Sequence, residues 1–339
     1  MVFISSFILA CTSSKQSSID TSTSPLETET ITEAADSSSE IDSSQEDSAS
    51  FDSGNIEDGN ETSPEPFTLS FVVVESVVGG LKLTTNLPMY FSDCENLRVS
   101  ELNCSDDDQD GLTDVWEDLV IEHFRPMLWM DEDEPFSTDP NGVFAQIARI
   151  APTNEWIDLF IVLGWSEDYG RCGISAHPGD SERVALRLVP DVETGSVSFY
   201  SVYTAAHEGE ITDAGRIWSE AELTELDFIA DPQSNLPRWI VYPSEGKHAT
   251  YATIAHCESV SVIPCLEEDC GPDNTPDPNE LLLFGPVINA GEEDYPRHDD
   301  LSVVGFPTES IWGEQDFCGG LGGQNCSSPI REKLRDNPF

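Results

Sequence analysis

The sequence is poor in basic residues. Its 339 residues include 15 Lys and Arg against 65 Asp and Glu, which gives a formal net charge of −50 at pH 7. Such a chain repels the phosphates of nucleic acids, so we expect no nucleic-acid partner. Cations are the more natural partners of a chain with this charge.

Long apolar runs are also missing. None approaches the roughly 20 residues that a membrane helix needs, so no membrane-spanning helix is predicted. The sequence has no Gly-x-Ser-x-Gly elbow, phosphate loop, dinucleotide-binding fingerprint or His-Glu-x-x-His pair. The common enzyme classes that use these motifs are therefore not indicated, and whether the chain is an enzyme stays open.

The cysteines have no C-x-x-C spacing, which disfavours a zinc or thioredoxin-like site. There are nine, of which Cys11 stands alone near the start and the other eight form an even set. An even set predicts disulfides in an exported protein, and nearness in sequence favours the pairs Cys94–Cys104 and Cys318–Cys326. The alternative is a cytosolic protein with free thiols.

The first eleven residues are predicted to be a lipoprotein signal. Residues 8–11, Ile-Leu-Ala-Cys, resemble a bacterial lipobox. That resemblance implies a lipid on Cys11, membrane attachment through this lipid, and a location in the bacterial cell envelope, on the outer membrane or cell surface. No Lys or Arg precedes the apolar stretch, unlike a usual signal peptide. An apolar terminus with a chance Cys is the alternative.

Residues 12–66 are predicted to form a disordered tether. They contain 22 Ser and Thr, 14 Asp and Glu, and Lys15 as their one basic residue. Such a segment buries too little apolar surface to offset the loss of chain entropy on folding. We expect it to hold the rest of the chain away from the membrane.

A run of acidic residues at 106–117 has the spacing of a calcium loop. The 12-residue loop of an EF-hand takes oxygen ligands from positions 1, 3, 5, 7, 9 and 12 and needs a glycine at position 6, where Gly111 stands. The predicted ligands are Asp106, Asp108, Asp110, the carbonyl of Leu112, Asp114 and Glu117. Calcium is expected rather than magnesium because a flexible loop with about six or seven oxygens suits the larger ion.

The residues after this loop are predicted to form a helix. Apolar residues recur with helical spacing over 112–124, and Pro126 follows. No helix is indicated before the loop, so the pattern predicts half an EF-hand in which calcium supports the structure. The alternative is a solvated acidic turn without an ion.

Strand signals dominate the rest of the chain. Short β-branched or aromatic runs occur at 71–74, 159–163, 184–188, 197–203 and 239–242. Helical spacing is scarce outside 112–124 and 219–226. We therefore predict a mainly β fold, an antiparallel β-sandwich at 131–339, preceded by a short β segment at 67–104 and the calcium loop with its helix at 105–130.

Two carboxylates begin one of these strands on its buried face. Side chains alternate along a strand, so Asp180 and Glu182 share a face with the apolar residues at 184, 186 and 188. Buried charges need partners. A divalent cation, calcium or magnesium, bound by Asp180, Glu182 and His177 would supply one. Arg171 or Arg183 as a salt-bridge partner is the alternative.

Several blocks in this region resemble the vacuolar protein sorting-associated protein 62 family. They succeed one another in order over residues 120–315, and they comprise segments 124–126, 131–135, 177–182, 201–207, 239–242, 246–251 and 312–313. The His-x-x-Asp-x-Glu element at 177–182 is also similar to that of plant-necrosis-inducing toxins. These toxins are β-sandwich proteins that bind a divalent cation and attack membranes.

The likeness to the toxins implies a set of cation ligands, namely Asp168, His177, Asp180 and Glu182. The resemblance also places His207 and His248 beside the same site, although lone histidines at strand ends are as often structural. Ser181 stands where both families usually have Trp. Gly179 stands where the toxins have a second His, which argues against toxin activity.

These features predict a surface-anchored, calcium-binding lipoprotein whose second cation binds a glycan or a lipid head group. A metal-dependent hydrolase is the first alternative, with a cation-activated water and His207 or His248 as general base. A membrane-damaging, toxin-like protein is the second.

Overall fold

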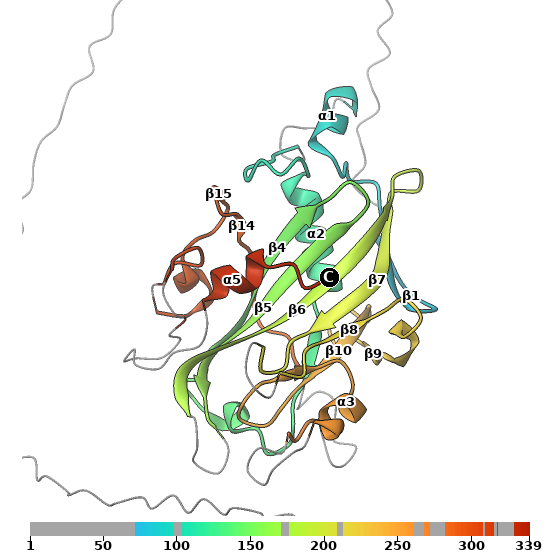
Figure 1. Cartoon of the computed structure of the whole chain (residues 1–339). Helices are drawn as coiled ribbons and strands as arrows, with labels where there is room; N and C mark the ends of the chain where they lie inside the picture. The colour runs from blue at the N-terminus through green and yellow to red at the C-terminus, as the bar shows by residue number, and fades with distance from the viewer. Residues whose placement is uncertain are drawn as a thin grey trace, which may run out of the picture. The chain divides into compact units, whose positions relative to one another are not determined.

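The computed structural model describes residues 72–97, 104–170, 176–208, 213–260, 268–271, 282–307, 309–314, 317 and 329–339 (Figure 1). The predicted lipoprotein signal and tether lie outside these residues, as do Arg171, Cys318 and Cys326. No helix in the described part is both long and apolar enough to cross a membrane.

The described part is mainly β and is built around an eight-stranded sheet. Its strand order is β1-β2-β7-β6-β5-β4-β13, and β8 also pairs with β7. Neighbouring strands are antiparallel except β13 and β4, which are parallel. The strands are β1 Val72–Val77, β2 Gly80–Thr85, β4 Phe144–Pro152, β5 Ile157–Asp168, β6 His177–Asp191, β7 Ser196–Thr204, β8 Arg216–Trp218 and β13 Val287–Asn289.

A five-stranded sheet packs against the first one. Its order is β11-β10-β3-β12, with β9 also paired to β10. These strands are β3 Met127–Trp129, β9 Phe228–Ala230, β10 Pro237–Pro243, β11 Thr250–Tyr251 and β12 Leu282–Leu283, and a separate hairpin joins β14 Gly291–Glu292 to β15 Tyr295–Pro296. The helices are α1 Phe91–Leu97, α2 Asp114–Phe124, α3 Ile254–Ser259 and α5 Ile330–Arg335, with short 3-10 turns at Pro135–Thr138, Leu223–Glu225 and Leu301–Val304.

The central strands of the large sheet are buried on both faces. On β5, Leu159 and Ile161 join the main core, whereas Phe160 and Val162 belong to a second core. The main core includes residues of both sheets and of α2. The second core includes residues of the Leu301–Val304 turn and α5. This alternation explains why the sequence of β5 is apolar at nearly every position.

The predicted fold class is confirmed. The five predicted strand runs fall in β1, β5, β6, β7 and β10, and the helix predicted after the acidic loop is α2. The large sheet is antiparallel in its centre, and its main core lies against the smaller sheet, as a β-sandwich requires.

Two details of the helix prediction were wrong. α1 precedes the loop, where no helix was indicated, and residues 219–226 contain only the 3-10 turn Leu223–Glu225. α1 has seven residues, too few for an apolar period to stand out, and it carries Cys94. The predicted disulfide Cys94–Cys104 is present, and a second one joins Cys257 to Cys270.

Replacing Leu186 by Ala should strongly destabilise the fold. Leu186 is fully buried and lies between Leu159 and Val202 in the sheet register. The cavity should lower the free energy of unfolding by about 2–5 kcal/mol, measured by urea denaturation. Val192→Ala, at a position that is 66% exposed, is the control and should change it by less than about 0.5 kcal/mol. Equal effects of the two substitutions would contradict the placement of the core.

Candidate metal centre

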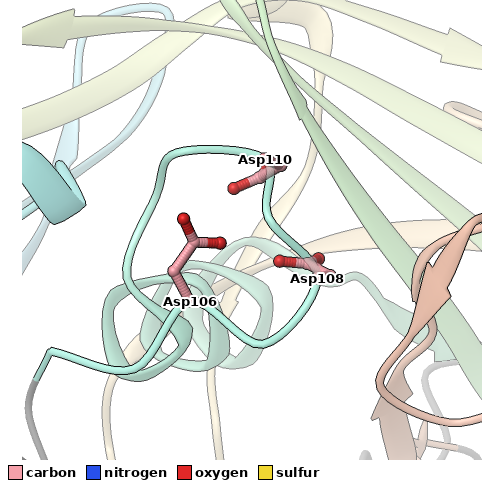
Figure 2. Close-up of side chains that lie close together, drawn as sticks. All are labelled: Asp106, Asp108 and Asp110. Carbon is pink, nitrogen blue, oxygen red and sulfur yellow. The ribbon is translucent and has the colours of Figure 1, made fainter.

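The acidic loop turns where the sequence places its glycine. Gly111 has φ of 92°, and Gln109 also has a positive φ, 61°. A Cβ on Gly111 would meet nothing within 4 Å, so the glycine is needed for its backbone conformation and not for space. Figure 2 shows the side chains of Asp106, Asp108 and Asp110 gathered around this turn.

The loop is anchored to the segment that precedes it. Leu112 pairs with Tyr90 in an isolated antiparallel bridge, and the hydroxyl of Thr113 donates to the carbonyl of Pro88 at 2.6 Å. The disulfide from Cys94 closes on Cys104, directly before the loop. The disulfide fixes the loop's entry, the contacts of Leu112 and Thr113 hold its second half, and α2 fixes its exit.

Carboxylates of the loop converge closely. Ligand atoms of Asp106, Asp108 and Asp110 lie within 4.8 Å of one another, and so do those of Asp108, Asp114 and Glu117. Asp108 is 1% exposed and Glu117 is fully buried. Five buried carboxylate oxygens have no hydrogen-bond partner, namely Asp106 Oδ1, both oxygens of Asp108, Asp110 Oδ2 and Glu117 Oε1. Unpaired buried carboxylates are costly, so this donor set fits a divalent cation.

Burial changes the acidity of this cluster. It raises the pKa of Asp108 to about 6 and that of Asp110 to about 7. Burial, with the charges of Asp110 and Asp108, raises the pKa of Glu117 to about 10. Without a cation, the folded state therefore favours protonated carboxyl groups at this site.

One arginine neutralises part of the cluster. Arg297 lies 3.5 Å from Asp114, 3.5 Å from Glu117 and 2.9 Å from Asp118. Asn289 donates to Glu117 Oε2 at 3.4 Å. A single guanidinium cannot balance the six acidic groups around it, and most of the unpaired oxygens belong to residues that it does not bind. The negative charge of the loop therefore exceeds the positive charge that Arg297 supplies, and a cation could balance the difference.

The second predicted set lies at one end of β5 and β6. Asp168 is opposite His177 in the strand register, Trp165 is opposite Asp180, and Leu163 is opposite Glu182. Asp180 and Glu182 are buried and share a face with Val184 and Leu186, which belong to the main core. The strand face predicted from the alternation is confirmed.

His177 lies beside Asp168 at the end of the two strands. Its Nδ1 lies 2.8 Å from the carbonyl of Gly179, which can only accept a hydrogen bond, so in the neutral ring Nδ1 carries the proton. Nε2 lies 3.3 Å from Asp168 Oδ2. Either a proton or a cation between these two atoms would join them. Burial and the charge of Asp180 also raise the pKa of Asp168 to about 6.

Asp180 has a different partner. His248 Nδ1 lies 3.0 Å from Asp180 Oδ2, and its Nε2 lies 3.4 Å from Glu134 Oε1. The ring is fully buried and stacks on Trp165 with a centroid distance of 4.0 Å. Burial alone would lower the pKa of His248, but hydrogen bonding to Asp180 and Glu134 raises it to about 9. His248 is therefore a cation between two carboxylates at neutral pH.

Glu182 lies further along the strand. Burial raises the pKa of Glu182 to about 8, against the opposing charge of Lys333. Lys333 reaches from α5 and donates to the carbonyl of Ser181. His207 Nε2 lies 2.7 Å from Glu268 Oε1. The Arg183 alternative was wrong, because Arg183 pairs with Glu208 and with carbonyls of the C-terminal segment.

The four residues of the second set do not form one compact group. Among the described residues, groups of three or more acidic, His or Cys side chains with ligand atoms within 4.8 Å occur only in the 106–117 loop. Asp168 pairs with His177, Asp180 pairs with His248, and Glu182 stands apart. Sequence reasoning missed Glu134, Glu268 and Lys333, which reach these groups from distant segments and show no local pattern.

No family model matches the chain, and no curated protein matches it. The chain is similar to a solved structure described as "Toxin fold for microbial attack and plant defense", with 15% identity over 38% of this chain and a TM-score of 0.24. That match spans 63% of the solved chain, less than two thirds of its length. Two other similar structures are NLPPya in complex with mannosamine, with 16% identity over 41% of this chain and 67% of that one and a TM-score of 0.27, and NLPPya in complex with glucosamine, with 16% identity over 43% and 80% and a TM-score of 0.25. Any assignment of function therefore rests on the site's own geometry.

Removing one loop charge should change how stability depends on pH when metal is absent. Because the pKa of Asp110 is raised to about 7 in the folded state, its protonation stabilises the fold, and this contribution is lost as pH rises from about 4 through 7. In chelator, Asp110→Asn should therefore gain stability relative to the unmodified protein over this range. Thermal melts at stepwise pH test this. If the stability difference between Asp110→Asn and the unmodified protein stayed constant with pH, the raised pKa of Asp110 would be contradicted.

Proposed function

We propose that this protein is an exported, calcium-binding module whose 106–117 loop holds one calcium ion. The observation that supports this most strongly is the set of five buried carboxylate oxygens without a hydrogen-bond partner. An ion there would bind Asp106, Asp108, Asp110, Asp114, Glu117 and the carbonyl of Leu112. Its chemistry would be structural, because neutralising the loop carboxylates removes their repulsion.

Calcium suits this loop better than magnesium. All side-chain donors are carboxylate oxygens, and Glu117 at the twelfth position can give both of its oxygens. Calcium accepts about six to eight oxygens in a flexible shell, whereas magnesium requires a tight octahedron and retains several waters. The acidic charge of the loop also favours a hard cation over a transition metal.

The proposed location is the bacterial cell envelope, with a lipid on Cys11 as the membrane anchor. The disulfides Cys94–Cys104 and Cys257–Cys270 support an oxidising compartment. Residues 12–66 would then act as the tether that separates the folded part from the membrane. We also propose that residues 120–315 belong to the vacuolar protein sorting-associated protein 62 family.

A second divalent cation is proposed at the ends of β5 and β6. The contact of His177 Nδ1 with the carbonyl of Gly179 supports it, because backbone bonding at Nδ1 is how proteins orient a metal-binding imidazole, and Nε2 then faces Asp168. Asp180, whose charge acts on Asp168, would add to the negative surroundings of the ion, and Glu182 would contribute from further along the strand. A hydroxylated or anionic ligand, a glycan or a lipid head group, would bind through this cation.

The geometry favours binding over hydrolysis. A hydrolase would need His207 or His248 as a free general base near the cation. His248 is held by two carboxylates, which raise its pKa to about 9, so it is protonated at neutral pH. Burial alone would lower the pKa of His207, but its bond to Glu268 raises it. Both imidazoles therefore act better as positive partners of carboxylates than as bases.

Calcium should raise the melting temperature of the protein, and Asp108→Asn should largely abolish the increase. Asp108 contributes two unpaired buried oxygens to the loop. The exposed neighbour Asp107 at the second position is the matched control, and Asp107→Asn should keep the full increase. Melting curves in calcium and in chelator measure this. Identical melting temperatures in the two solutions would refute the calcium site.

The double substitution Asp180→Asn with Glu182→Gln should remove one bound ion per chain. Both carboxylates lie on the inner face at the end of β6. Metal content after dialysis against calcium measures the effect. Glu167→Gln, one residue from Asp168 along β5, is the control and should leave the content unchanged. Unaltered stoichiometry in the double variant would count decisively against the second cation.

A further inference from the structure

A polar pocket of about 510 Å³ lies directly against the acidic loop. Its walls come from the loop, the end of β4, the β14–β15 hairpin, Trp312 and Arg335. The hairpin touches the loop, since a Cβ on Gly291 would come within 3.0 Å of the Asp108 Cβ. Neither of the two proposed cation sites accounts for this pocket, although Asp108 and Asp110 form one of its walls.

The pocket contains a rigid polar pair. Arg149 donates to both carboxylate oxygens of Glu292 at 2.8 to 3.0 Å and to the carbonyl of Leu334 at 3.0 Å. The two side chains are only 15% and 27% exposed. Because the pair is held from several sides, its remaining donor and acceptor positions have fixed directions. Fixed planar groups of this kind suit ligands with neighbouring hydroxyl groups, each of which can donate and accept.

Two aromatic side chains also line the pocket. Trp312 is nearly buried, and its indole N–H donates to the carbonyl of Ala290 at 3.4 Å, which fixes the ring. Tyr295 is 49% exposed. An exposed tyrosine on a short hairpin is an amphipathic contact surface with little entropy to lose on binding.

The charge of the lining selects against anionic ligands. It carries three consecutive hairpin acids at 292–294, together with Asp108 and Asp110, against Arg149 and Arg335. A divalent cation in the loop would leave the lining close to neutral, with one net negative charge. Phosphates, sulfates and carboxylates would meet repulsion there and from the whole chain, whose net charge is −50.

The pocket shares a residue with the proposed calcium site. Asp108 lines the pocket, is 1% exposed, and has two carboxylate oxygens without a partner. A cation in the loop would neutralise the wall that Asp108 forms. The charge of the pocket would then depend on that ion.

We infer that this pocket binds a neutral saccharide unit. The Arg149–Glu292 pair would hydrogen-bond its hydroxyl groups, and the Tyr295 ring would cover its apolar C–H face. Its volume falls within the usual range of about 300 to 1,000 Å³ for small-ligand sites. This inference rests on the proposed calcium ion in the loop, whose role here is to neutralise and order the wall.

The test is a titration of the calcium-loaded protein with a panel of neutral methyl glycosides of glucose, galactose, mannose, fucose and N-acetylglucosamine. Glucose 6-phosphate and glucuronate are the anionic arm. Saturation-transfer NMR and calorimetry should detect at least one neutral sugar and neither anion. Tyr295→Ala should weaken that binding by about tenfold while calcium stoichiometry stays the same.

Tyr200→Ala, at a partly buried aromatic on β7 that does not line the pocket, is the matched control and should bind the sugar normally. The inference is overturned if calcium binds but no neutral sugar does, if an anion binds better, or if Tyr295→Ala leaves sugar binding unchanged. A protein that binds no calcium overturns the proposed function instead. If Tyr295→Ala weakened sugar binding but chelator did not, the sugar would bind in this pocket without help from the calcium ion.

Discussion

The structure depends on how the buried negative charge of the 106–117 loop is balanced. Five carboxylate oxygens there lack partners, and Arg297 supplies only one positive charge. The elements around the loop hold these groups together despite their repulsion: the Cys94–Cys104 disulfide at the entry, Tyr90 beside Leu112, and α2 at the exit. Asp114 and Glu117 lie in the first turn of α2, where the helix dipole also favours negative charge. A divalent cation would resolve the conflict that these constraints create.

Buried negative charge is balanced in a different way at the ends of β5 and β6. Alternation along β6 turns Asp180 and Glu182 toward the core, where unpaired charge is costly. The fold supplies positive partners from elsewhere, His248 to Asp180 and Lys333 near Glu182. The Asp168–His177 pair has the geometry that could hold a cation. The two acidic regions thus differ: the loop has a large excess of unpaired oxygens, while the strand ends are mostly neutralised by the protein itself.

The acidic loop, the helix after it and the inner face of β6 could be predicted from the sequence, because each depends on the local spacing of residues. The acidic residues of the loop follow a 12-residue pattern, and the inner face of β6 follows from a period of two. The helix after the loop showed its apolar spacing, whereas α1 is too short to show one. The contacts that neutralise the strand ends could not be predicted, since Glu134, Glu268 and Lys333 come from distant segments that only the folded chain brings together. For the same reason, the pocket between the loop and the β14–β15 hairpin could not be predicted from the sequence.

The most direct measurement is a crystal structure of the protein grown with calcium, with anomalous scattering used to locate the ion. A peak should appear in the 106–117 loop, within about 2.3–2.6 Å of oxygens of Asp106, Asp108, Asp110 and Glu117. Asp108 and Glu117 should then have all of their oxygens engaged. An ordered loop with no peak, and with Arg297 or waters satisfying those oxygens instead, would contradict the central role given to the cation.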